Sequence, residues 1–460
     1  MTSMAVESTS ASNPHTGLSI NGPRLLQTLT EIAAIGALPD GGVQRLAFSP
    51  EEQAARQTVA AWMHEAGMRT VTDAAGNLIG RYPGRTPKAP ALGIGSHLDT
   101  AFNASAYDGT YSLLAGLEVV RSLQEQDIQL DHPLEIIVFA DEERTMIGSK
   151  AMAGRASQEA EHYYHPDYPP IEAGVEAIGG SWPVLASARR PPGSLAAFVE
   201  LHMEPGPVLA AAQVPIGLVT GIVGQRRFLV TIEGQASHAG TTPMTMRQDA
   251  LVAASRMVLA VSRIGQIRDD VITGDQVATV GTITVAPNVA NTIPGQAQLT
   301  VDMRDMSNSS LDRLFALLED EAGAIAAVTK TEITITPQLR NEPAPASTAV
   351  YNAIVQVCRD LDVVAEPLPS RASHDAQAMA HITDMGMIFV PSQKGAGHTE
   401  AEYALPEHCT MGANVLLHTL LRLDQHYRID DEQQADSNQD NNAQDKTQSQ
   451  TQDKTQGDSD

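Results

Sequence analysis

The sequence predicts an α/β protein in which a smaller domain is inserted into a larger one. Short apolar runs alternate with helical patterns over most of the 460 residues, as they do when helices connect buried parallel strands. In the middle of the chain this alternation gives way to a different order of elements, and it then resumes. Histidines and acidic residues follow the apolar runs directly, which places candidate chemistry at the ends of strands.

The larger domain is indicated by four apolar runs with helices between them. The runs are ALGIGS at 91–96, LEIIVFA at 134–140, LAAFVEL at 195–201 and MIFVP at 387–391. Residues Glu51–Ala66 and Leu113–Leu123 show the helical spacing of apolar side chains. We expect this domain to consist of two parts of the chain, residues 21–216 and 339–428.

The smaller domain, residues 217–338, has the predicted order strand, helix, strand, strand, helix, strand. These elements are expected at 227–234, 247–264, 276–285, 296–304, 311–327 and 331–336. Their order is that of the ferredoxin-like split βαβ unit, which is a domain in its own right. The Pro- and Ala-rich stretch 341–347 then leads back into the larger domain.

Composition and charge exclude several classes of protein. Lys and Arg number 30 against 55 Asp and Glu, and a net charge of -25 is unsuited to binding nucleic acid or an anionic membrane. The cysteines, Cys358 and Cys409, offer neither a disulfide framework nor a cysteine zinc site. Because no signal-peptide pattern or transmembrane-length apolar run is found, we expect a cytoplasmic protein.

Both ends of the chain are expected to be disordered. Residues 1–20 are largely polar, and residues 429–460 are dominated by Asp, Gln, Asn, Ser and Thr. Such segments cannot bury enough apolar surface to offset the entropy of ordering them. The acidic tail is interpreted as a solvated spacer, with recruitment of a partner as the alternative.

The first candidate site residues follow the run at 91–96. His97 and Asp99 are two residues apart, so in an extended segment they lie on one side, where a carboxylate can orient a metal-binding imidazole. Taken alone, the pair fits a structural histidine better than a metal ligand. Asp108 precedes a predicted helix, and it is either a ligand or the N-cap of that helix.

The other apolar runs also end in chemically active residues. The run 134–140 leads into Asp141, Glu142 and Glu143, whose mutual repulsion favours a bound cation. The last two runs lead to His202 and His398. Nitrogen and oxygen ligands for two closely spaced divalent ions, bridged by one carboxylate, are therefore available from His97, Asp108, Glu143, His202 and His398.

Several motifs together carry a resemblance to a known family. They are GSHLDT, YDG, DEE, ELHMEPGPVL, GQRRFLVTIEGQASHAGTTPM, NTIPG with VDMRD, SHDAQ, MIFVPS and GAGH. From about residue 25 to residue 427 the chain resembles the hydantoinase/carbamoylase amidases of the M20-type metallopeptidase clan. This group includes N-carbamoyl-L-amino-acid hydrolases and allantoate and ureidoglycolate amidohydrolases. The stretch 215–244 is the most specific part, because it separates the group from ordinary M20 peptidases.

The resemblance implies a dimetal, aminopeptidase-like catalytic domain, an inserted dimerisation domain and hence a homodimer. It further implies two divalent ions in each subunit, one on His97, Asp108 and His202 and the other on Asp108, Glu143 and His398. Zinc is the first choice, and manganese, cobalt and nickel are alternatives for such ligands. In the same pattern Glu142 is the general base, and Asp99 orients His97.

The resemblance also implies contacts with a substrate. His238 reaches the active site of the neighbouring subunit and steadies the developing oxyanion. Asn291 and Arg304 clamp the substrate carboxylate, with Gln225 and His374 as further contacts. Without the resemblance, Arg304 also fits a surface charge, Asn291 a turn residue and His374 the start of a helix.

The sequence departs from the family pattern around the expected substrate pocket. Arg144-Thr145-Met146-Ile147 replaces Gly-x-Arg-Phe, Pro205 replaces Gln, Arg371-Ala372-Ser373 replaces Gly-Ala-Gly, Gly397 replaces Ser, and the loop 103–106 lacks a Gly. The metal positions are kept. We therefore expect an atypical substrate, with a second anionic group or a different acyl group on nitrogen.

The expected reaction is hydrolysis of the carbon–nitrogen bond of an N-carbamoyl-L-amino acid or related ureido acid, which gives amino acid, ammonia and carbon dioxide. The partner is then a small molecule with a carboxylate. Allantoate or ureidoglycolate is an alternative substrate. An M20-type aminoacylase or dipeptidase that cleaves an ordinary amide, and a metal-free binding protein on the same scaffold, are alternative functions.

Overall fold

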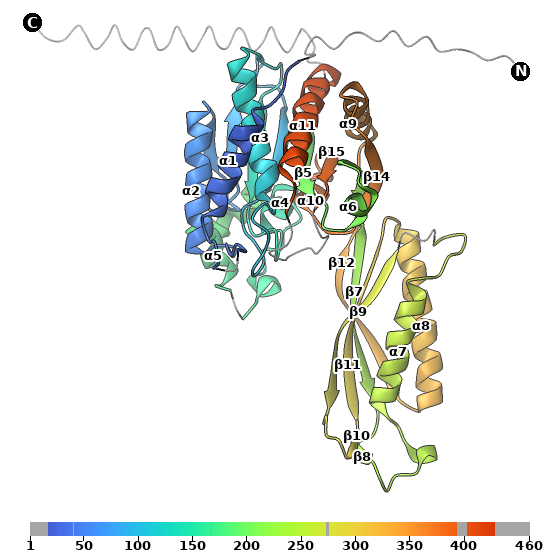
Figure 1. Cartoon of the computed structure of the whole chain (residues 1–460). Helices are drawn as coiled ribbons and strands as arrows, with labels where there is room; N and C mark the ends of the chain where they lie inside the picture. The colour runs from blue at the N-terminus through green and yellow to red at the C-terminus, as the bar shows by residue number, and fades with distance from the viewer. Residues whose placement is uncertain (1–16, 40, 167, 273–275, 393–402, 428–460) are drawn as a thin grey trace, which may run out of the picture.

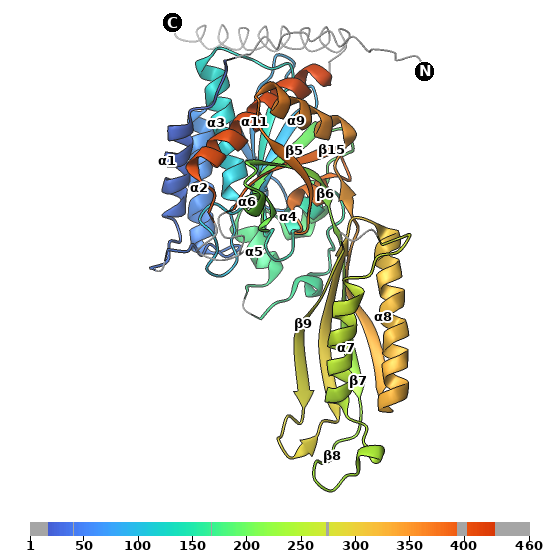
Figure 2. The same cartoon turned by 45° about the vertical axis from the view of Figure 1, so that its right-hand side comes forward.

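The computed structural model describes residues 17–39, 41–166, 168–272, 276–392 and 403–427. These residues form two bodies, which Figures 1 and 2 show as a broad upper part and an elongated lower part. The larger body comprises the described residues 17–222 and 344–427, and the smaller body comprises residues 224–341. The predicted α/β architecture with an interrupted larger domain is therefore confirmed.

A nine-stranded sheet lies at the centre of the larger body, in the order β1-β2-β4-β3-β5-β15-β6-β13, with β14 also pairing with β6. Its strands are β1 (Arg69–Thr72), β2 (Leu78–Tyr82), β3 (Ala91–His97), β4 (Leu134–Phe139), β5 (Leu195–Met203), β6 (Ile216–Ile222), β13 (Ala344–Pro345), β14 (Ala365–Ser370) and β15 (Asp384–Val390). The four strands β4, β3, β5 and β15 are parallel neighbours. They contain the four predicted apolar runs, so their carboxyl ends meet at one edge.

Helices cover both faces of this sheet. One face packs against α1 (Gly22–Ala33), α2 (Pro50–Glu65), α3 (Thr110–Glu125), α9 (Thr348–Asp360) and α11 (Pro406–His426). The other face packs against the short helices α4 (Ile147–Met152), α6 (Val208–Ala212) and α10 (Asp375–Met379), with α5 (Ile171–Ala177) beside them. Three further segments are 3₁₀ helices, at Ala160–Tyr163 and Trp182–Ala188 in the larger body and at Met244–Met246 in the smaller body, and the second of them is kinked at Val184. Burial on both faces explains why the central strands are apolar throughout.

The smaller body is an antiparallel sheet in the order β12-β7-β11-β9, with two helices on one face (Figure 1). Its elements are β7 (Gly224–Glu233), α7 (Ala250–Ile264), β9 (Val277–Ala286), β11 (Gln296–Asp305), α8 (Asn308–Thr329) and β12 (Glu332–Asn341). Along β11 the residues alternate between buried and half-buried, as expected of a sheet covered on one face. A two-stranded ribbon of β8 (Ser237–His238) and β10 (Thr292–Ile293) lies at the end farther from the larger body (Figures 1 and 2).

The structure corrects the predicted boundaries of the smaller body. Residues 217–222 belong to β6 of the large sheet, where they pair with β14 and β15, so the chain enters the smaller body only at Val223. At the other end β12 continues to Asn341, beyond the predicted limit at 338, because it stays paired with β7. Both boundaries were placed too early.

The amino-terminal boundary also differs from the prediction. Ile20 is buried in the main core, and its main-chain N–H donates to Asn414 Oδ1 at 2.9 Å. Residues 1–16 and the acidic tail from 428 lie outside the described residues. Within the described residues, no helix combines the length and the apolar character needed to cross a bilayer.

Candidate active site

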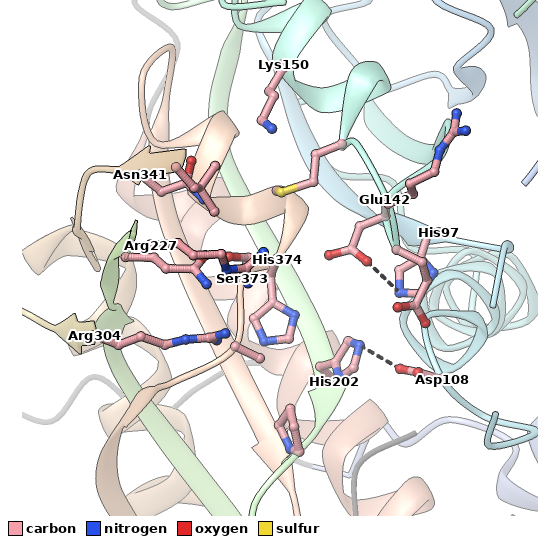
Figure 3. Close-up of a pocket in the computed structure, with 17 residues that line it drawn as sticks. His97, Asp108, Glu142, Lys150, His202, Arg227, Arg304, Asn341, Ser373 and His374 are labelled. Carbon is pink, nitrogen blue, oxygen red and sulfur yellow. Dashed lines mark ion pairs between the residues drawn. The ribbon is translucent and has the colours of Figure 1, made fainter. Parts of the chain in front are cut away.

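Three candidate metal ligands come together at the carboxyl edge of the parallel strands. His97 ends β3, His202 lies near the end of β5, and Asp108 lies in the loop before α3. All three are buried, and one nitrogen or oxygen atom from each lies within 4.8 Å of the other two. Asp108 Oδ1 is 3.3 Å from His202 Nε2 (Figure 3).

Main-chain carbonyls orient both histidines. His97 Nδ1 donates to the carbonyl of Asp99 at 2.8 Å, and His202 Nδ1 donates to the carbonyl of Met203 at 2.8 Å. With Nδ1 bonded to a carbonyl, Nε2 is the nitrogen of each ring that can bind a cation, and in His202 it would do so after giving up the proton that it shares with Asp108. Two imidazole nitrogens and a carboxylate oxygen are the ligand types that zinc and its neighbours prefer. The residues present therefore fit a divalent ion.

Asp108 is not a helix cap. The N-cap of α3 is Gly109, which has a φ of 63° and no side-chain capping bond. A Cβ at this glycine would meet the carbonyl oxygen of His97 at 2.5 Å. The YDG motif thus lets the chain pass tightly against His97, and this leaves Asp108 facing His202.

The structure corrects the role expected of the Asp99 carboxylate. It was expected to hold His97, but Oδ1 of Asp99 lies 3.8 Å from the nearest ring nitrogen, and the main-chain carbonyl makes the bond instead. The carboxylate accepts the main-chain N–H of Glu142 at 3.3 Å and that of Glu143 at 3.1 Å. Asp99 therefore fixes both the β3 loop and the β4 loop.

The two adjacent glutamates lie at the centre of an excess of negative charge. Burial raises the pKa of Glu142 well above its usual value, and repulsion from Asp375 and Glu143 adds to this. Burial, together with Asp108 and Asp99, raises the pKa of Glu143 in the same way. Cations near these carboxylates would relieve this repulsion, as the DEE sequence predicted.

The same negative charge affects the pKa of His202. Burial lowers its pKa, but the hydrogen bond and charge of Asp108 outweigh burial and raise the pKa to about 9. Burial lowers the pKa of His97, which leaves that ring neutral. His97 Nε2 also lies 3.6 Å from Glu142 Oε2 (Figure 3). Glu142 is thus close to the candidate ligands.

A cavity of about 430 Å³ opens over these residues and has walls from both bodies. The larger body contributes the residues at the strand ends, and the smaller body contributes Gln225, Arg227, Arg304, Leu339 and Asn341. Figure 3 shows Arg304, Arg227 and Asn341 facing His97, Glu142 and His202 across the cavity. A ligand in this cavity would touch both bodies.

The smaller body presents its polar residues as a row across three strands. Gln225 of β7 is paired with Arg304 of β11 on one side and with Asn341 of β12 on the other. Paired residues in neighbouring antiparallel strands face the same side of the sheet, so all three point into the cavity. Arg304 Nε donates to Asp302 Oδ1 at 2.8 Å, and its Nη1 donates to the Arg371 carbonyl at 2.7 Å. The guanidinium is therefore held in a fixed orientation.

His374 was predicted as a substrate contact, and it lines the cavity. It occupies the N-cap position of α10, so the helix-start interpretation also applies, but its side chain makes no capping bond. Its ring packs edge-on against His202 with centroids 4.6 Å apart, and Nε2 lies 2.9 Å from Ser370 Oγ. Burial lowers the pKa of His374 well below its usual value, so the ring is neutral.

Two predicted residues lie elsewhere. His238 of β8 is paired with Thr292 of β10, and the carbonyl of Asn291 accepts the N–H of Ala239 at 2.9 Å. Both residues lie at the far end of the smaller body (Figure 1), and neither lines the cavity of its own chain. The structure therefore separates Asn291 from Arg304, so these two residues do not form one clamp within a chain. His398 lies outside the described residues.

Sequence reasoning missed several residues of the site. Glu200 is buried next to His202 and His374, and its carboxylate accepts Ser96 Oγ–H at 2.9 Å and the Ala376 N–H at 2.9 Å. Asp375, in the SHDAQ motif, is fully buried and close enough to raise the pKa of Glu142. Glu200 stands two residues before His202, a spacing that puts both on one side of β5.

The departures from the family pattern fall partly on the cavity wall. Pro205, Arg144 and Met146 line it. The exposed side chain of Arg371, another departure, is not among the residues that line the cavity, and the Arg371 carbonyl accepts a hydrogen bond from Arg304. Gly397 lies outside the described residues.

Comparison with known proteins agrees with this geometry. Residues 94–422 match the sequence model of peptidase family M20/M25/M40. An N-carbamoyl-L-amino acid amidohydrolase of Geobacillus stearothermophilus is 39% identical over 411 residues, which cover 88% of this chain and 99% of that protein. An allantoate amidohydrolase of Bacillus subtilis is 33% identical over 398 residues, which cover 85% of this chain and 95% of that protein.

Solved structures give the same picture. An amidase of the hydantoinase/carbamoylase family from Burkholderia multivorans aligns with a TM-score of 0.80 and 36% identity, over 88% of this chain and 98% of that chain. The similarity therefore extends through both bodies.

Proposed function

Since the chain belongs to peptidase family M20/M25/M40, we propose that it is a metal-dependent amidohydrolase that cleaves an N-carbamoyl-L-amino acid. The observation that carries this proposal is the cavity in which His97, Asp108, His202 and Glu142 face Arg304 across the two bodies. The 39% identity to an N-carbamoyl-L-amino acid amidohydrolase supports the choice of substrate. Allantoate or ureidoglycolate is the second candidate, since an allantoate amidohydrolase is 33% identical.

His97, Asp108 and His202 fit one of the two divalent ions that the family implies, and His398, which the second ion would need, lies outside the described residues. His97, Asp108 and His202 would hold one ion, and Asp108, Glu143 and His398 would hold the other, with zinc as our first choice and manganese, cobalt or nickel as alternatives. Such ions supply a water of lowered pKa and polarise a carbonyl group. The raised pKa values of Glu142 and Glu143 support this assignment, because they reflect buried negative charge that cations would balance.

Glu142 is the general base in this proposal. Its carboxylate takes a proton from the attacking water and then gives it to the departing nitrogen. Asp99 positions Glu142 by accepting its main-chain N–H.

The substrate carboxylate would bind to the row of polar residues on the smaller body, which consists of Gln225, Arg304 and Asn341. Arg304 donates charge-assisted hydrogen bonds, and Gln225 lies beside it as an amide donor. His374 contacts the reacting end from the floor of the cavity. Attack on the ureido carbonyl then yields the amino acid, ammonia and carbon dioxide.

The protein acts as a homodimer in this proposal, and the smaller body is the dimerisation domain. His238 lies too far from its own cavity to act there, so it would enter the partner's site and hydrogen-bond the oxyanion. Asn291 adjoins His238 and would act in the same partner site. We place the enzyme in the cytoplasm, in keeping with its small number of cysteines.

Ammonia release by the purified, zinc- or manganese-loaded protein tests this function. The panel contains N-carbamoyl-L-amino acids, N-carbamoyl-β-alanine, allantoate and ureidoglycolate, with a chelator control. N-acetyl amino acids are followed by amine release. We expect chelator-sensitive ammonia from an N-carbamoyl-L-amino acid. Amine from an acetylated amino acid without ammonia from any ureido compound would instead assign an aminoacylase.

A further inference from the structure

A second cavity opens beside the first. It has a volume of about 250 Å³ and shares Met146, Lys150 and Asn341 with the main cavity. Its remaining wall includes Arg155, Arg340, Glu342 and His381. We call this space the annex. Because three residues line both cavities, a ligand in the main cavity can extend a side chain into the annex.

The annex carries a surplus of positive charge. Glu342 is its acidic residue, and the Glu342 carboxylate already pairs with Arg340 Nε at 2.7 Å and with Arg226 Nη2 at 3.6 Å. Lys150 Nζ donates to the Thr145 carbonyl at 2.8 Å. Among the described residues no carboxylate lies within 4 Å of the charged groups of Lys150 or Arg155. Two cations thus remain available to an anion.

The annex lies where the second carboxylate of a small dicarboxylic acid would reach if the first carboxylate were bound to Arg304. Arg304 and Asn341 are two strands apart in the row, with Gln225 between them, so their backbones are roughly 10 Å apart. Arg304 reaches the cavity from β11, and the annex begins at Asn341 of β12. Figure 3 shows the Lys150 amine and the Arg304 guanidinium entering the cavity from different sides, with Glu142 opposite.

Burial disfavours the charged form of Lys150. It lowers the pKa of Lys150, although Glu142 and Asp375 act in the opposite direction. A carboxylate bonded to the amine would stabilise its charged form and satisfy donors that face the cavity. A neutral side chain of the same shape would leave them without an ionic partner.

We propose that the annex is a side-chain subsite that selects N-carbamoyl amino acids with an acidic side chain, and that Lys150 pairs with the side-chain carboxylate. This inference rests on the proposed function, because it places the α-carboxylate on Arg304 and the ureido group near Glu142. Arg155 lies farther along the annex and serves the longer of two acidic side chains.

Kinetics with matched acids and amides test the subsite. The substrates are N-carbamoyl-L-aspartate against N-carbamoyl-L-asparagine, and N-carbamoyl-L-glutamate against N-carbamoyl-L-glutamine. We expect kcat/KM to favour at least one acid over its amide by about tenfold or more. Lys150→Gln and, separately, Arg155→Gln should reduce that ratio, by about tenfold for Lys150, whereas Lys88→Gln on the surface should not change it.

The outcomes separate this inference from the proposed function. Hydrolysis of neutral ureido acids with no preference for the acids overturns the subsite and leaves the function intact. Loss of activity by the same factor on acid and amide in Lys150→Gln also overturns it, since Lys150 would then only balance Glu142. If no ureido compound is hydrolysed, the function is wrong, and the subsite is judged by thermal unfolding of the metal-loaded protein. Equal increases in melting temperature with the acid and with its amide would then overturn the subsite as well.

Discussion

Asp99 fixes Glu142, the proposed general base, through the backbone, because its Oδ1 accepts the main-chain N–H of Glu142 at 3.3 Å. The other oxygen accepts the N–H of Glu143. One carboxylate thus sets the positions of two residues that differ in their proposed roles. Its pKa is raised to about 7 by burial and by the nearby Glu52 charge, against the effect of these two bonds.

Replacement of Asp99 by Asn should lower turnover more than metal binding. The amide keeps one acceptor but presents an N–H₂ group to a main-chain N–H, so the loop carrying Glu142 shifts. We expect kcat to fall by about 10- to 100-fold. Metal content by elemental analysis and kcat by ammonia release check this. Asp127→Asn, at a surface turn, is the matched control, and an unchanged kcat in Asp99→Asn would contradict the role.

The two neighbouring glutamates should respond differently to amide substitution. Glu142→Gln removes a proton acceptor but keeps size and shape, so turnover should fall at least about 100-fold with metal content near normal. Glu143→Gln should lose metal as well as activity. Metal analysis of both variants decides the assignment. Loss of metal from Glu142→Gln would make Glu142 a ligand rather than a base.

After metal removal, the stability of the protein should fall as the pH rises. The pKa values of Asp99 and Asp141 are raised to about 7 by burial, whereas carboxyls of the unfolded chain titrate near about 4. Between these values the folded state binds more protons than the unfolded state, so stability falls as pH rises. We expect the metal-free protein to melt about 5 °C lower at about pH 8 than at about pH 6.

A metal-loaded sample serves as the control for this effect, since bound cations should remove most of the pH dependence in that range. Thermal unfolding followed by circular dichroism at both pH values measures the difference. A metal-free protein that is more stable at the higher pH would show that the carboxyl cluster does not carry the repulsion assigned to it.

Mixed dimers should restore activity that each parent variant lacks. A dimer of one His238→Ala chain and one Glu142→Gln chain has a single site with both Glu142 and the partner's His238. Equal amounts of the two variants, unfolded and refolded together, should give about one quarter of the wild-type activity. Each variant refolded alone is the control. No recovery, with mixed dimers present by mass spectrometry, would show that His238 does not act across the interface.

The sequence predicted the strands and the residues at their ends well, because both depend on local patterns. Apolar runs such as 134–140 can be buried only in a sheet covered on both faces, and β4 lies there. The ferredoxin-like order of the smaller body was confirmed for the same reason. Its limits were less well predicted, since the pairing of β6 with β14 joins segments far apart in the chain.

The rest of the site depends on such long-range contacts. Lys150 and Asn341 reach one cavity from α4 and β12, and no local motif relates them. The separation of His238 from its own cavity follows from the length of β7, which carries it to the far end of the smaller body. The carboxylate of Asp99 binds backbone groups 43 and 44 residues away, a contact that spacing alone does not predict.

The division of the cavity wall between two bodies has a mechanical consequence. The chain passes between them only at Val223 and again at Glu342 and Pro343, where β6 leads to β7 and β12 leads to β13. A bound substrate held by Arg304 on one side and by the strand-end residues on the other is a third connection. Unfolding of either body would then require release of the ligand, so saturation with substrate analogue should merge the melting of the two bodies into one cooperative transition.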